Sequence, residues 1–373
     1  MFGEWLRSQR DRLLSDPGFH YRVLRFFPTR WIARRRARQL FDIAVGFSYS
    51  QTLAACVELD LFERLRSGPV SSQVLSQELG LPVDGLRSLL GAAAELDLLE
   101  RRRDDVWRLG QLGAASLGNP GVSAMVRHHR LLYQDLLDPV SLFRDRSNSA
   151  LGDYWRYAAT PGASEPVTAA SYSELMAISQ SFVADDVLSH CALYDREHLM
   201  DLGGGSGAFV EEALRRHPRL RATVVDLPHV APLAEERLEQ AGLAARGVAM
   251  SGNIFEGDFP ARADVISLVR ILHDHDDEPV EQLLRHARRA LTSDGLLIIA
   301  EPMAETRGAP GVGAYFHVYL WAMRSGQPRS RQKLRRMLEA AGFADVRERA
   351  TFQPALVRII TARPGEAVPS PTM

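Results

Sequence analysis

The sequence of 373 residues has little cysteine and lacks a long apolar run. Its two cysteines, Cys56 and Cys191, lie far apart without CxxC spacing, which argues against a disulfide framework or a cysteine-based zinc site. No apolar run approaches the roughly 20 residues of a membrane span, and the N-terminus lacks the apolar core of a signal peptide. We therefore expect a cytoplasmic protein that contacts a membrane, if at all, only at its surface.

An excess of charge of one sign is also absent, since the formal net charge is −1. The chain as a whole therefore has no field that would attract nucleic acid. Residues 1–40 differ, because they hold ten arginines against three acidic residues, with aromatic residues between them. This segment predicts either an arm that rests on anionic lipid or a helical arm whose aromatic side chains pack on a partner subunit. Pro28 interrupts its helical periodicity, which favours the second interpretation.

Residues 46–110 show the pattern of three short helices followed by a hairpin, which is the order of a winged helix. A winged helix suggests DNA binding, but the presumptive recognition helix, residues 84–97, carries three acidic residues against the single arginine Arg87. Affinity for DNA rests on several basic contacts. We therefore expect a dimerisation module that forms a homodimer and binds no nucleic acid.

Beyond residue 173 the sequence alternates between strands and helices, which indicates a mostly parallel sheet. Only a short turn at Gln353-Pro354 separates the last two strands, so they must be antiparallel. The predicted fold class is α/β, a Rossmann-like class I methyltransferase sheet with a closing antiparallel hairpin, preceded by a mostly helical winged-helix domain. We place the domains at 1–165 and 166–364, with a disordered tail at 365–373. The predicted strands are residues 197–202, 221–226, 247–252, 263–269, 295–301, 344–351 and 355–362.

A glycine-rich turn, Asp201–Gly207, ends the first of these strands and opens a helix. Gly203, Gly205 and Ala208 satisfy the pattern G-x-G-x-x-G/A, which fits NAD as well as S-adenosylmethionine. S-adenosylmethionine has no phosphate, but it offers a carboxylate, an ammonium, a ribose and a sulfonium. The crowded turn lets the backbone pass close to the methionine part, and Asp201 is placed to meet the ammonium.

The ends of the next two strands carry the other candidate cofactor-binding residues. Asp226 stands 23 residues after Gly203, where a carboxylate can accept both ribose hydroxyls, and Leu227 follows it. After the third strand, the amide of Asn253 is placed to meet the adenine amino group and Ile254 to meet its face. The alternative is a plain strand–helix connection without a ligand.

The fourth strand runs into His273, at the carboxyl end of the sheet where ligands bind in open α/β folds. His273 is the candidate general base, which would accept the proton of a hydroxyl as a methyl group arrives. Glu301, at the end of the fifth strand, is the natural carboxylate to orient it. A metal bound by His273 and His275, or a purely structural histidine, are the alternatives; we predict no metal.

The winged-helix half and the motifs DLGGGSG, DLPHV, GNIF and ILHDHDDE together resemble the two-domain, homodimeric O-methyltransferases that include plant caffeic acid and animal acetylserotonin enzymes. The resemblance implies that Asp226, Asn253 and Arg270 contact S-adenosylmethionine and that His273 is the base. The sequence departs from the plant pattern at three positions. Asn253 replaces an aspartate, Arg270 a tryptophan, and Pro328 a second glutamate beside the histidine. A single-carboxylate arrangement is therefore expected.

Three further stretches resemble the bacterial hydroxyneurosporene/demethylspheroidene O-methyltransferases of carotenoid biosynthesis. The resemblance implies methylation of the tertiary C1 hydroxyl of an acyclic carotenoid, with peripheral contact at the inner or photosynthetic membrane. Residues 315–323 are apolar and aromatic enough to wall a pocket for such a hydrocarbon or to form a buried core helix. The alternative substrates are a phenolic or polyketide small molecule, or a bacteriochlorophyll-pathway intermediate. The three stretches are FPTRWIARRRARQLFDIAVGFSYSQ, LGNPGVSAMVRHH and ILHDHDD.

Overall fold

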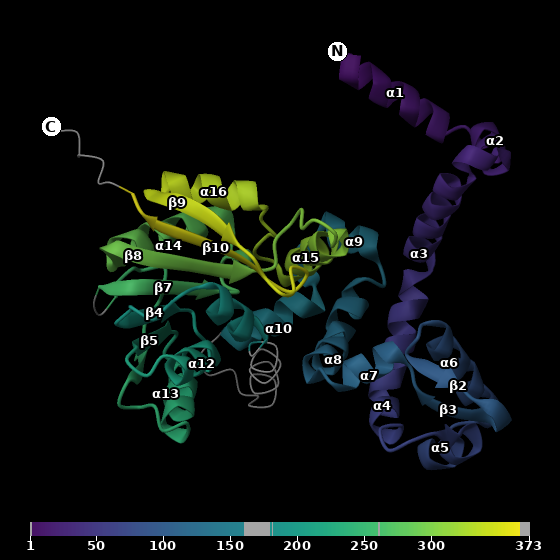
Figure 1. Cartoon of the computed structure of the whole chain (residues 1–373), viewed down its shortest axis with the longest axis horizontal. Coiled ribbons are helices and arrows are strands. Elements are labelled where there is room, and N and C mark those ends of the chain that lie inside the picture. Colours follow the sequence, from purple (N-terminus) through teal and green to yellow (C-terminus); the bar gives the residue numbers. More distant parts are fainter. Residues whose placement is uncertain (1, 160–179, 181, 260–261, 366–373) are drawn as a thin grey trace. The chain divides into compact units, whose positions relative to one another are not determined.

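A computed structural model of the chain describes residues 2–159, 180, 182–259 and 262–365. The chain divides into two compact units, residues 1–127 and residues 128–373 (Figure 1). The domain boundary predicted after residue 165 lies outside the described residues, as does nearly all of the predicted tail. Both therefore stay predictions.

The first unit begins with three helices, α1 (Phe2–Leu14), α2 (Pro17–Arg25) and α3 (Phe27–Glu58). The predicted interruption of the helix at Pro28 is confirmed, because α2 ends at Arg25 and α3 begins at Phe27. Pro28 lies in the first turn of α3, where a backbone N–H has no intrahelical partner to lose. The proline therefore starts a new helix at a bend in the chain.

Helix α3 is also the one helix of the described residues that is long and apolar enough, by length and composition, to cross a membrane. Its last residues, Cys56 and Val57, are buried in the core of the first unit. The first of the three predicted short helices is thus the end of this 32-residue helix, continued by the single turn α4 (Leu61–Arg64).

The rest of the first unit has the order of a winged helix. A three-stranded antiparallel sheet in the order β1-β3-β2 packs with α5 and α6 around Leu75, Leu90 and Trp107. The hairpin was predicted, but β1 was not, because two residues are too few to show strand alternation. The elements are β1 (Val70–Ser71), α5 (Ser72–Leu79), α6 (Val83–Glu95), β2 (Leu99–Arg101), η1 (Arg103–Asp105), β3 (Val106–Leu109) and α7 (Gln111–Leu117).

The second unit is built on one seven-stranded sheet with the order β6-β5-β4-β7-β8-β10-β9. The five neighbouring strands β6, β5, β4, β7 and β8 are parallel, and β10 runs antiparallel to both β8 and β9. The predicted parallel sheet and its closing hairpin are therefore confirmed. The strands are β4 (His198–Leu202), β5 (Arg221–Asp226), β6 (Gly247–Ser251), β7 (Ala263–Val269), β8 (Leu291–Glu301), β9 (Phe343–Arg349) and β10 (Arg358–Pro364).

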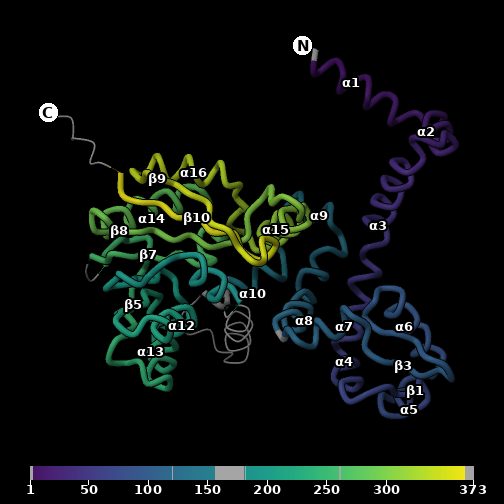
Figure 2. The backbone as a smooth tube through the Cα atoms, in the orientation of Figure 1, coloured from purple at the N-terminus to yellow at the C-terminus, as the bar shows by residue number. Residues whose placement is uncertain are grey.

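Helices cover both faces of this sheet, so its strands are apolar on both sides (Figure 2). Consecutive residues alternate between the faces: Leu199 packs with α12 and α13, whereas Met200 packs with α14 and α16. The helices and short 3₁₀ turns are α8 (Pro120–Asp135, shared with the first unit), α9 (Pro139–Arg144), η2 (Arg146–Asn148), α10 (Ala150–Ala159), α12 (Ala208–Arg216), α13 (Ala231–Gln240), η3 (Leu272–Asp274), α14 (Asp277–Ala290), α15 (Pro310–Met323) and α16 (Arg331–Ala340).

The strand order decides which chain segments meet. Because β5, β4, β7 and β8 are neighbours, their carboxyl ends lie along one edge of the sheet. Asp201, Asp226 and Glu301 stand at or beside those ends, and His273 follows β7. Four segments that are far apart in sequence are thereby brought together.

Candidate active site

The turn between β4 and α12 is built around Gly203 and Gly204. Gly203 has a φ of +73°, a left-handed conformation that favours glycine, and a Cβ atom there would lie 2.5 Å from Cδ1 of Ile271. A Cβ atom on Gly204 would lie 2.5 Å from Oδ2 of Asp201 and 2.9 Å from Cγ1 of Val224. Neither position has room for a side chain. The bare backbone therefore forms a cradle at the carboxyl edge of the sheet.

Asp201 lies beneath this cradle with 1% of its surface exposed. Its Oδ1 accepts a hydrogen bond of 2.6 Å from the Ser267 hydroxyl, whereas Oδ2 has no hydrogen-bond partner among the described residues. Burial raises the pKa of the Asp201 carboxyl to about 7, against the hydrogen bond from Ser267 and with the added charge of Asp226. A buried carboxylate oxygen without a donor calls for a ligand with a polar or cationic group.

Asp226 ties the turn after β4 to the turn after β5. Its Oδ2 accepts a hydrogen bond of 2.7 Å from the Gly205 amide, and its Oδ1 accepts one of 2.7 Å from the Leu227 amide. Burial raises the pKa of Asp226, and these two amide hydrogen bonds oppose that rise. The predicted cofactor-binding residues Gly205, Asp226 and Leu227 therefore form one hydrogen-bonded group.

The two residues predicted after β6 differ in their environment. Ile254 is nearly buried, and its Cδ1 lies 3.6 Å from the position that a Cβ atom of Gly203 would take. Asn253 is exposed, and its side chain serves its own turn. It accepts a hydrogen bond from the Phe255 amide and donates one to Glu256, each 3.1 Å long. The structure thus brings Ile254 to the glycine turn and holds the Asn253 side chain locally.

His273 lies in the 3₁₀ turn η3 with only 4% of its surface exposed. Its Nδ1 is 3.5 Å from Oε2 of Glu301, and its Nε2 is 3.2 Å from Oδ1 of Asp274. The expectation of a single carboxylate is therefore wrong, because Asp274, next to His273 in the chain, supplies a second one. The same Oε2 of Glu301 accepts a 3.1 Å hydrogen bond from the His273 backbone amide. Burial acts to lower the pKa of His273, but the negative charges of Asp274 and Glu301 outweigh it, and the net shift is upward.

Arg270 immediately precedes this turn and has a φ of +60°, a left-handed conformation that is uncommon for a residue with a side chain. Its backbone amide donates a 2.8 Å hydrogen bond to the carbonyl of Ala300 on β8, which fixes the exit of the chain from β7. Its positive charge also lowers the pKa of His273, as the smallest of the contributions. The predicted residues Arg270, His273 and Glu301 are therefore together.

Arg329 is a functional candidate that the sequence analysis missed. It is fully buried, and its guanidinium donates hydrogen bonds to the backbone carbonyls of Leu272 and His275. Its Nε is also 3.0 Å from Oδ1 of Asp277. A lone arginine more than 50 residues downstream gives no motif. The only available signal was the acidic run after His275, which calls for a cation.

The segment around Arg329 supports the same loop at further points. The Ser325 hydroxyl donates to the carbonyl of Asp274 at 2.9 Å, and Lys333 Nζ lies 2.6 Å from Oδ2 of Asp277. A Cβ atom on Gly326 would lie 2.1 Å from the His273 carbonyl oxygen, so the two backbones touch. Residues 325–333, which we call the support segment, therefore hold the loop that carries His273.

An aromatic cluster from α15 lies beside His273. The ring of Phe316 meets the His273 ring edge-on at 5.6 Å between centroids. The hydroxyl of Tyr315 is 2.9 Å from Nε2 of His129, and that of Tyr319 is 2.7 Å from Nε2 of His128. The last residues of α15 are buried against α8, α9 and α10, so the prediction of a buried core helix is confirmed for this part of it.

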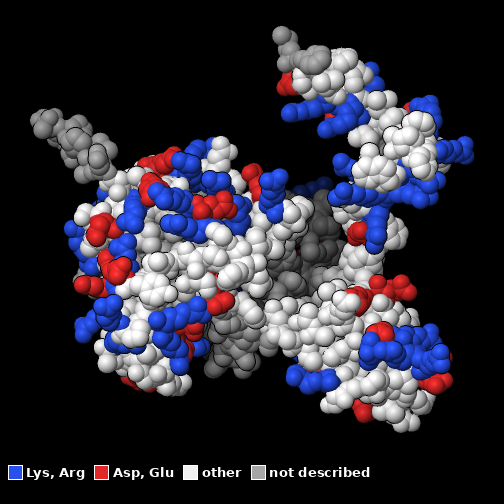
Figure 3. All heavy atoms as spheres, in the orientation of Figure 1, with Lys and Arg blue, Asp and Glu red and all other residues white. Residues whose placement is uncertain are grey.

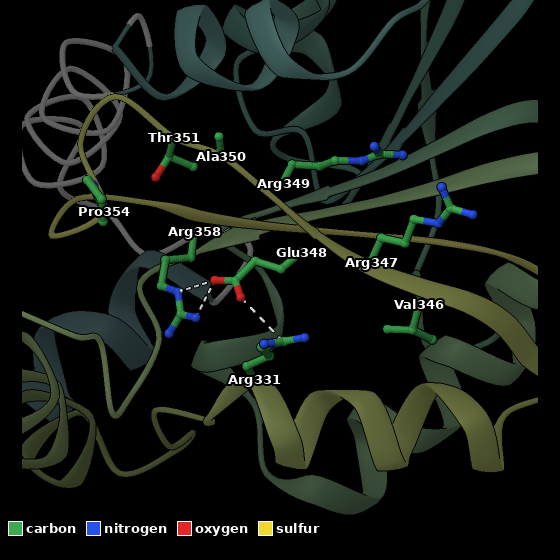
Figure 4. Close-up of a pocket in the computed structure, with 9 residues that line it drawn as sticks. All are labelled: Arg331, Val346, Arg347, Glu348, Arg349, Ala350, Thr351, Pro354 and Arg358. Atoms are coloured by element: carbon green, nitrogen blue, oxygen red, sulfur yellow. Dashed lines mark hydrogen bonds and ion pairs between the residues drawn. The ribbon is translucent and has the colours of Figure 1, made fainter.

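A pocket lies among α16, β9 and β10, and one of the residues that line it, Arg358, is the cross-strand neighbour of Glu301 (Figure 4). Arginines line much of it, but Arg331 and Arg358 both form ion pairs with Glu348. No predicted site residue lines it, and we assign it no role. Among the described residues, no group of three His, Cys, Asp or Glu side chains could hold a metal ion.

The chain matches the O-methyltransferase domain over residues 133–344 and the O-methyltransferase dimerisation domain over residues 41–118. It belongs to this two-domain O-methyltransferase family, and it is an enzyme that uses S-adenosylmethionine. The structure fits this cofactor through the bare cradle at Gly203 and Gly204 and the buried Oδ2 of Asp201 that lacks a donor.

Within that family the chain is similar to two demethylspheroidene O-methyltransferases. It is 40% identical to that of Cereibacter sphaeroides over 341 residues, which cover 91% of this chain and 90% of the relative. It is also 40% identical to that of Rhodobacter capsulatus over 336 residues, covering 90% and 84%.

Among solved structures, a mitomycin 7-O-methyltransferase has a TM-score of 0.74 at 25% identity, covering 90% of this chain and 99% of that one. Human N-acetylserotonin methyltransferase, solved in complex with SAM, has a TM-score of 0.73 at 24% identity and covers 89% and 98%. These likenesses confirm the predicted fold class, with its helical dimerisation domain before a Rossmann-like domain.

Proposed function

We propose that this enzyme methylates the tertiary C1 hydroxyl of an acyclic carotenoid of the hydroxyneurosporene or demethylspheroidene type. The observation that carries the proposal is the 40% identity, over about nine tenths of the chain, to two enzymes named for demethylspheroidene. The aromatic cluster of α15 beside His273 supports it, because such a surface suits an extended hydrocarbon.

The cofactor-binding role falls to the residues around the glycine turn. When bound, S-adenosylmethionine supplies a methyl group on a sulfonium. The Oδ2 of Asp201 would accept a hydrogen bond from its ammonium, and Asp226 would accept hydrogen bonds from the ribose hydroxyls. The bare backbone of the turn would hold the methionine part, and Ile254 would hold the adenine. The full proposed set is Asp201, Gly203, Gly205, Asp226, Leu227, Asn253, Ile254 and Arg270.

His273 is the proposed general base. A tertiary alcohol is too weakly acidic to ionise first, so its proton must leave as the methyl group arrives. His273 takes up that proton, and the nearby carboxylates of Asp274 and Glu301 stabilise the imidazolium that forms. Glu301 has the positioning role, because it accepts a hydrogen bond from the His273 backbone as well. A base of this kind contributes about 10²–10⁴-fold in rate.

The proposal extends to assembly and location. The dimerisation domain over residues 41–118 supports a homodimer. A carotenoid resides in the lipid bilayer, so we place the enzyme in the cytoplasm with peripheral contact at the inner or photosynthetic membrane. Both cysteines, Cys56 and Cys191, are free and buried, as suits a reducing compartment.

A phenolic or polyketide substrate is the second candidate, favoured by 33% identity over 273 residues to a 3-hydroxy-5-methyl-1-naphthoate 3-O-methyltransferase of Streptomyces sahachiroi, which covers 71% of this chain and 77% of the relative. One experiment separates the two. The protein is incubated with labelled S-adenosylmethionine and a panel of 1-hydroxylated acyclic carotenoids, phenols and hydroxynaphthoates. We expect label on the carotenoids; label only on the aromatic hydroxyls would overturn the proposal.

A further inference from the structure

The N-terminal 40 residues, which we call the basic arm, have a surface that neither the fold nor the active site uses. The basic arm comprises α1, α2 and the start of α3 and holds ten arginines against three acidic residues, a net charge of +7 in a chain of net charge −1. Figure 3 shows these blue side chains gathered over α1, α2 and α3. Positive charge is thus concentrated on these helices, whereas the rest of the chain carries a net charge of −8, from 35 basic and 43 acidic residues.

Large apolar side chains are exposed on the same helices. The residues Trp31 and Phe27 are 63% and 80% exposed, and the Arg30 guanidinium lies 5.7 Å from the Phe27 ring centroid. Along α1, Leu6 and Leu13 are exposed seven residues apart on one helix face, and Trp5 is exposed beside Leu6. The other aromatic residues of the basic arm that are more than half exposed are Tyr21 and Phe26.

Few of the arginines are neutralised within the basic arm. Of its ten arginines, only Arg10 and Arg22 form ion pairs with described residues, Arg10 with Asp11 and Arg22 with Asp16. The group at Arg34, Arg35, Arg36 and Arg38 is exposed on the first turns of α3. Helices with exposed aromatic and apolar groups beside uncompensated arginines are the type that lies in the interface of an anionic bilayer.

We propose that the basic arm is a docking surface for the anionic lipid headgroups of a bilayer, with its aromatic side chains at the depth of the headgroups. This inference deepens the proposed function and rests on it for the identity of the membrane. The dimerisation domain begins at residue 41, after the basic arm. Because the arms carry the same charge, two of them packed against each other about a two-fold axis would repel. An anionic bilayer matches both the charge and the apolar groups.

The test is co-sedimentation of the full-length protein with vesicles. We expect binding to vesicles of equal parts phosphatidylglycerol and phosphatidylcholine, weak binding to pure phosphatidylcholine, and loss of binding at high salt. Each basic residue near an anionic surface contributes roughly a fivefold gain in partitioning. The variant R34Q/R35Q/R36Q/R38Q should therefore bind at least about 100-fold more weakly.

A matched control removes four exposed arginines from helices of the second unit, R285Q/R289Q/R335Q/R336Q, and should bind vesicles like the unaltered protein. Equal losses in the two variants, or equal binding to the two kinds of vesicle, would overturn the proposal. A third result would also overturn it: the arm variant has an altered oligomeric mass, and the unaltered protein does not bind vesicles. The basic arm would then act on a partner subunit. If the unaltered protein does not bind vesicles but still methylates the carotenoid in detergent, the docking proposal fails and the proposed function stands. Vesicle binding without that activity contradicts the proposed function alone.

Discussion

The cofactor end of the candidate site and its catalytic loop differ in where their supporting contacts come from. Around the glycine turn, Asp226 and the amides it binds lie within about 25 residues of one another in sequence, and only the Ser267 hydroxyl on Asp201 comes from 66 residues away. The loop that carries His273 is held by the support segment, more than 50 residues away. Cofactor binding and catalysis should therefore respond to different substitutions, and four experiments test that separation.

The largest effect is expected from His273→Ala. Turnover should fall by about 10²–10⁴-fold because the hydroxyl proton loses its acceptor, while the affinity for S-adenosylmethionine changes little. Label transfer at saturating cofactor measures the first quantity and calorimetric titration the second. His275→Ala is the control, since that ring packs edge-on against Phe255 at 4.7 Å and makes no comparable pair with Glu301. A greater loss of turnover in His275→Ala contradicts the assignment of the base.

Arg329→Met should follow, with turnover lower by up to about 100-fold, as a small displacement of a catalytic group allows. The substitution leaves the carbonyls of Leu272 and His275 without their donor, which should reduce the free energy of unfolding by about 2–4 kcal/mol. As a positioning residue, Arg329 should affect kcat more than the cofactor dissociation constant. Both are measured below the melting temperature of the variant.

Arg331→Met is the matched control for this experiment, because Arg331 is half exposed and pairs with Glu348 at 3.3 Å. An exposed ion pair contributes at most about 1 kcal/mol, so stability and turnover should stay close to those of the unaltered protein. If Arg329→Met lowered kcat and cofactor affinity by similar factors, the loop that carries His273 and the glycine turn would depend on the same contacts, against the expected separation.

The same difference explains how far the sequence could predict the molecule. The sheet was predictable, since each strand is a short apolar run and a tight turn leaves β9 and β10 only one relative direction. Asp201, Asp226 and His273 were placed correctly at strand ends by position alone. Arg329 was not, because two of its partners are backbone carbonyls, which leave no trace in the sequence, and the third, Asp277, lies 52 residues away. Asn253 shows the opposite limit: its position suits a ligand, but its side chain bonds to its own turn.

Gly204→Ala should act on the cofactor end. Its Cβ atom would meet Oδ2 of Asp201 at 2.5 Å, and relieving such an overlap costs about 1–3 kcal/mol. We expect the cofactor dissociation constant to rise about tenfold or more while kcat at saturating cofactor is retained. Gly91→Ala, on α6 where a Cβ atom would meet nothing within 4 Å, should leave both unchanged. A fall in kcat with normal cofactor affinity would reverse the comparison.

The smallest expected effect is a pH dependence of cofactor binding through Asp201. Burial raises the pKa of this carboxyl to about 7 in the ligand-free protein, well above its ordinary value. The stability that protonated Asp201 contributes is therefore lost as the pH rises towards and through 7. A cationic ammonium favours the ionised form, so binding should release a proton and strengthen between pH 6 and 8, by at most about tenfold per pH unit.

Asp201→Asn removes that titration and separates it from any contribution of His273, whose pKa is also raised. Its amide keeps an oxygen that can accept from Ser267, but it carries no charge for the ammonium. The affinity of the variant should therefore be lower and constant from pH 6 to 8. The rise in melting temperature on adding S-adenosylmethionine, compared at both pH values, measures the same linkage. If the slope persists in Asp201→Asn, the titrating group lies elsewhere, and the catalytic loop rather than the glycine turn senses the cofactor's charge.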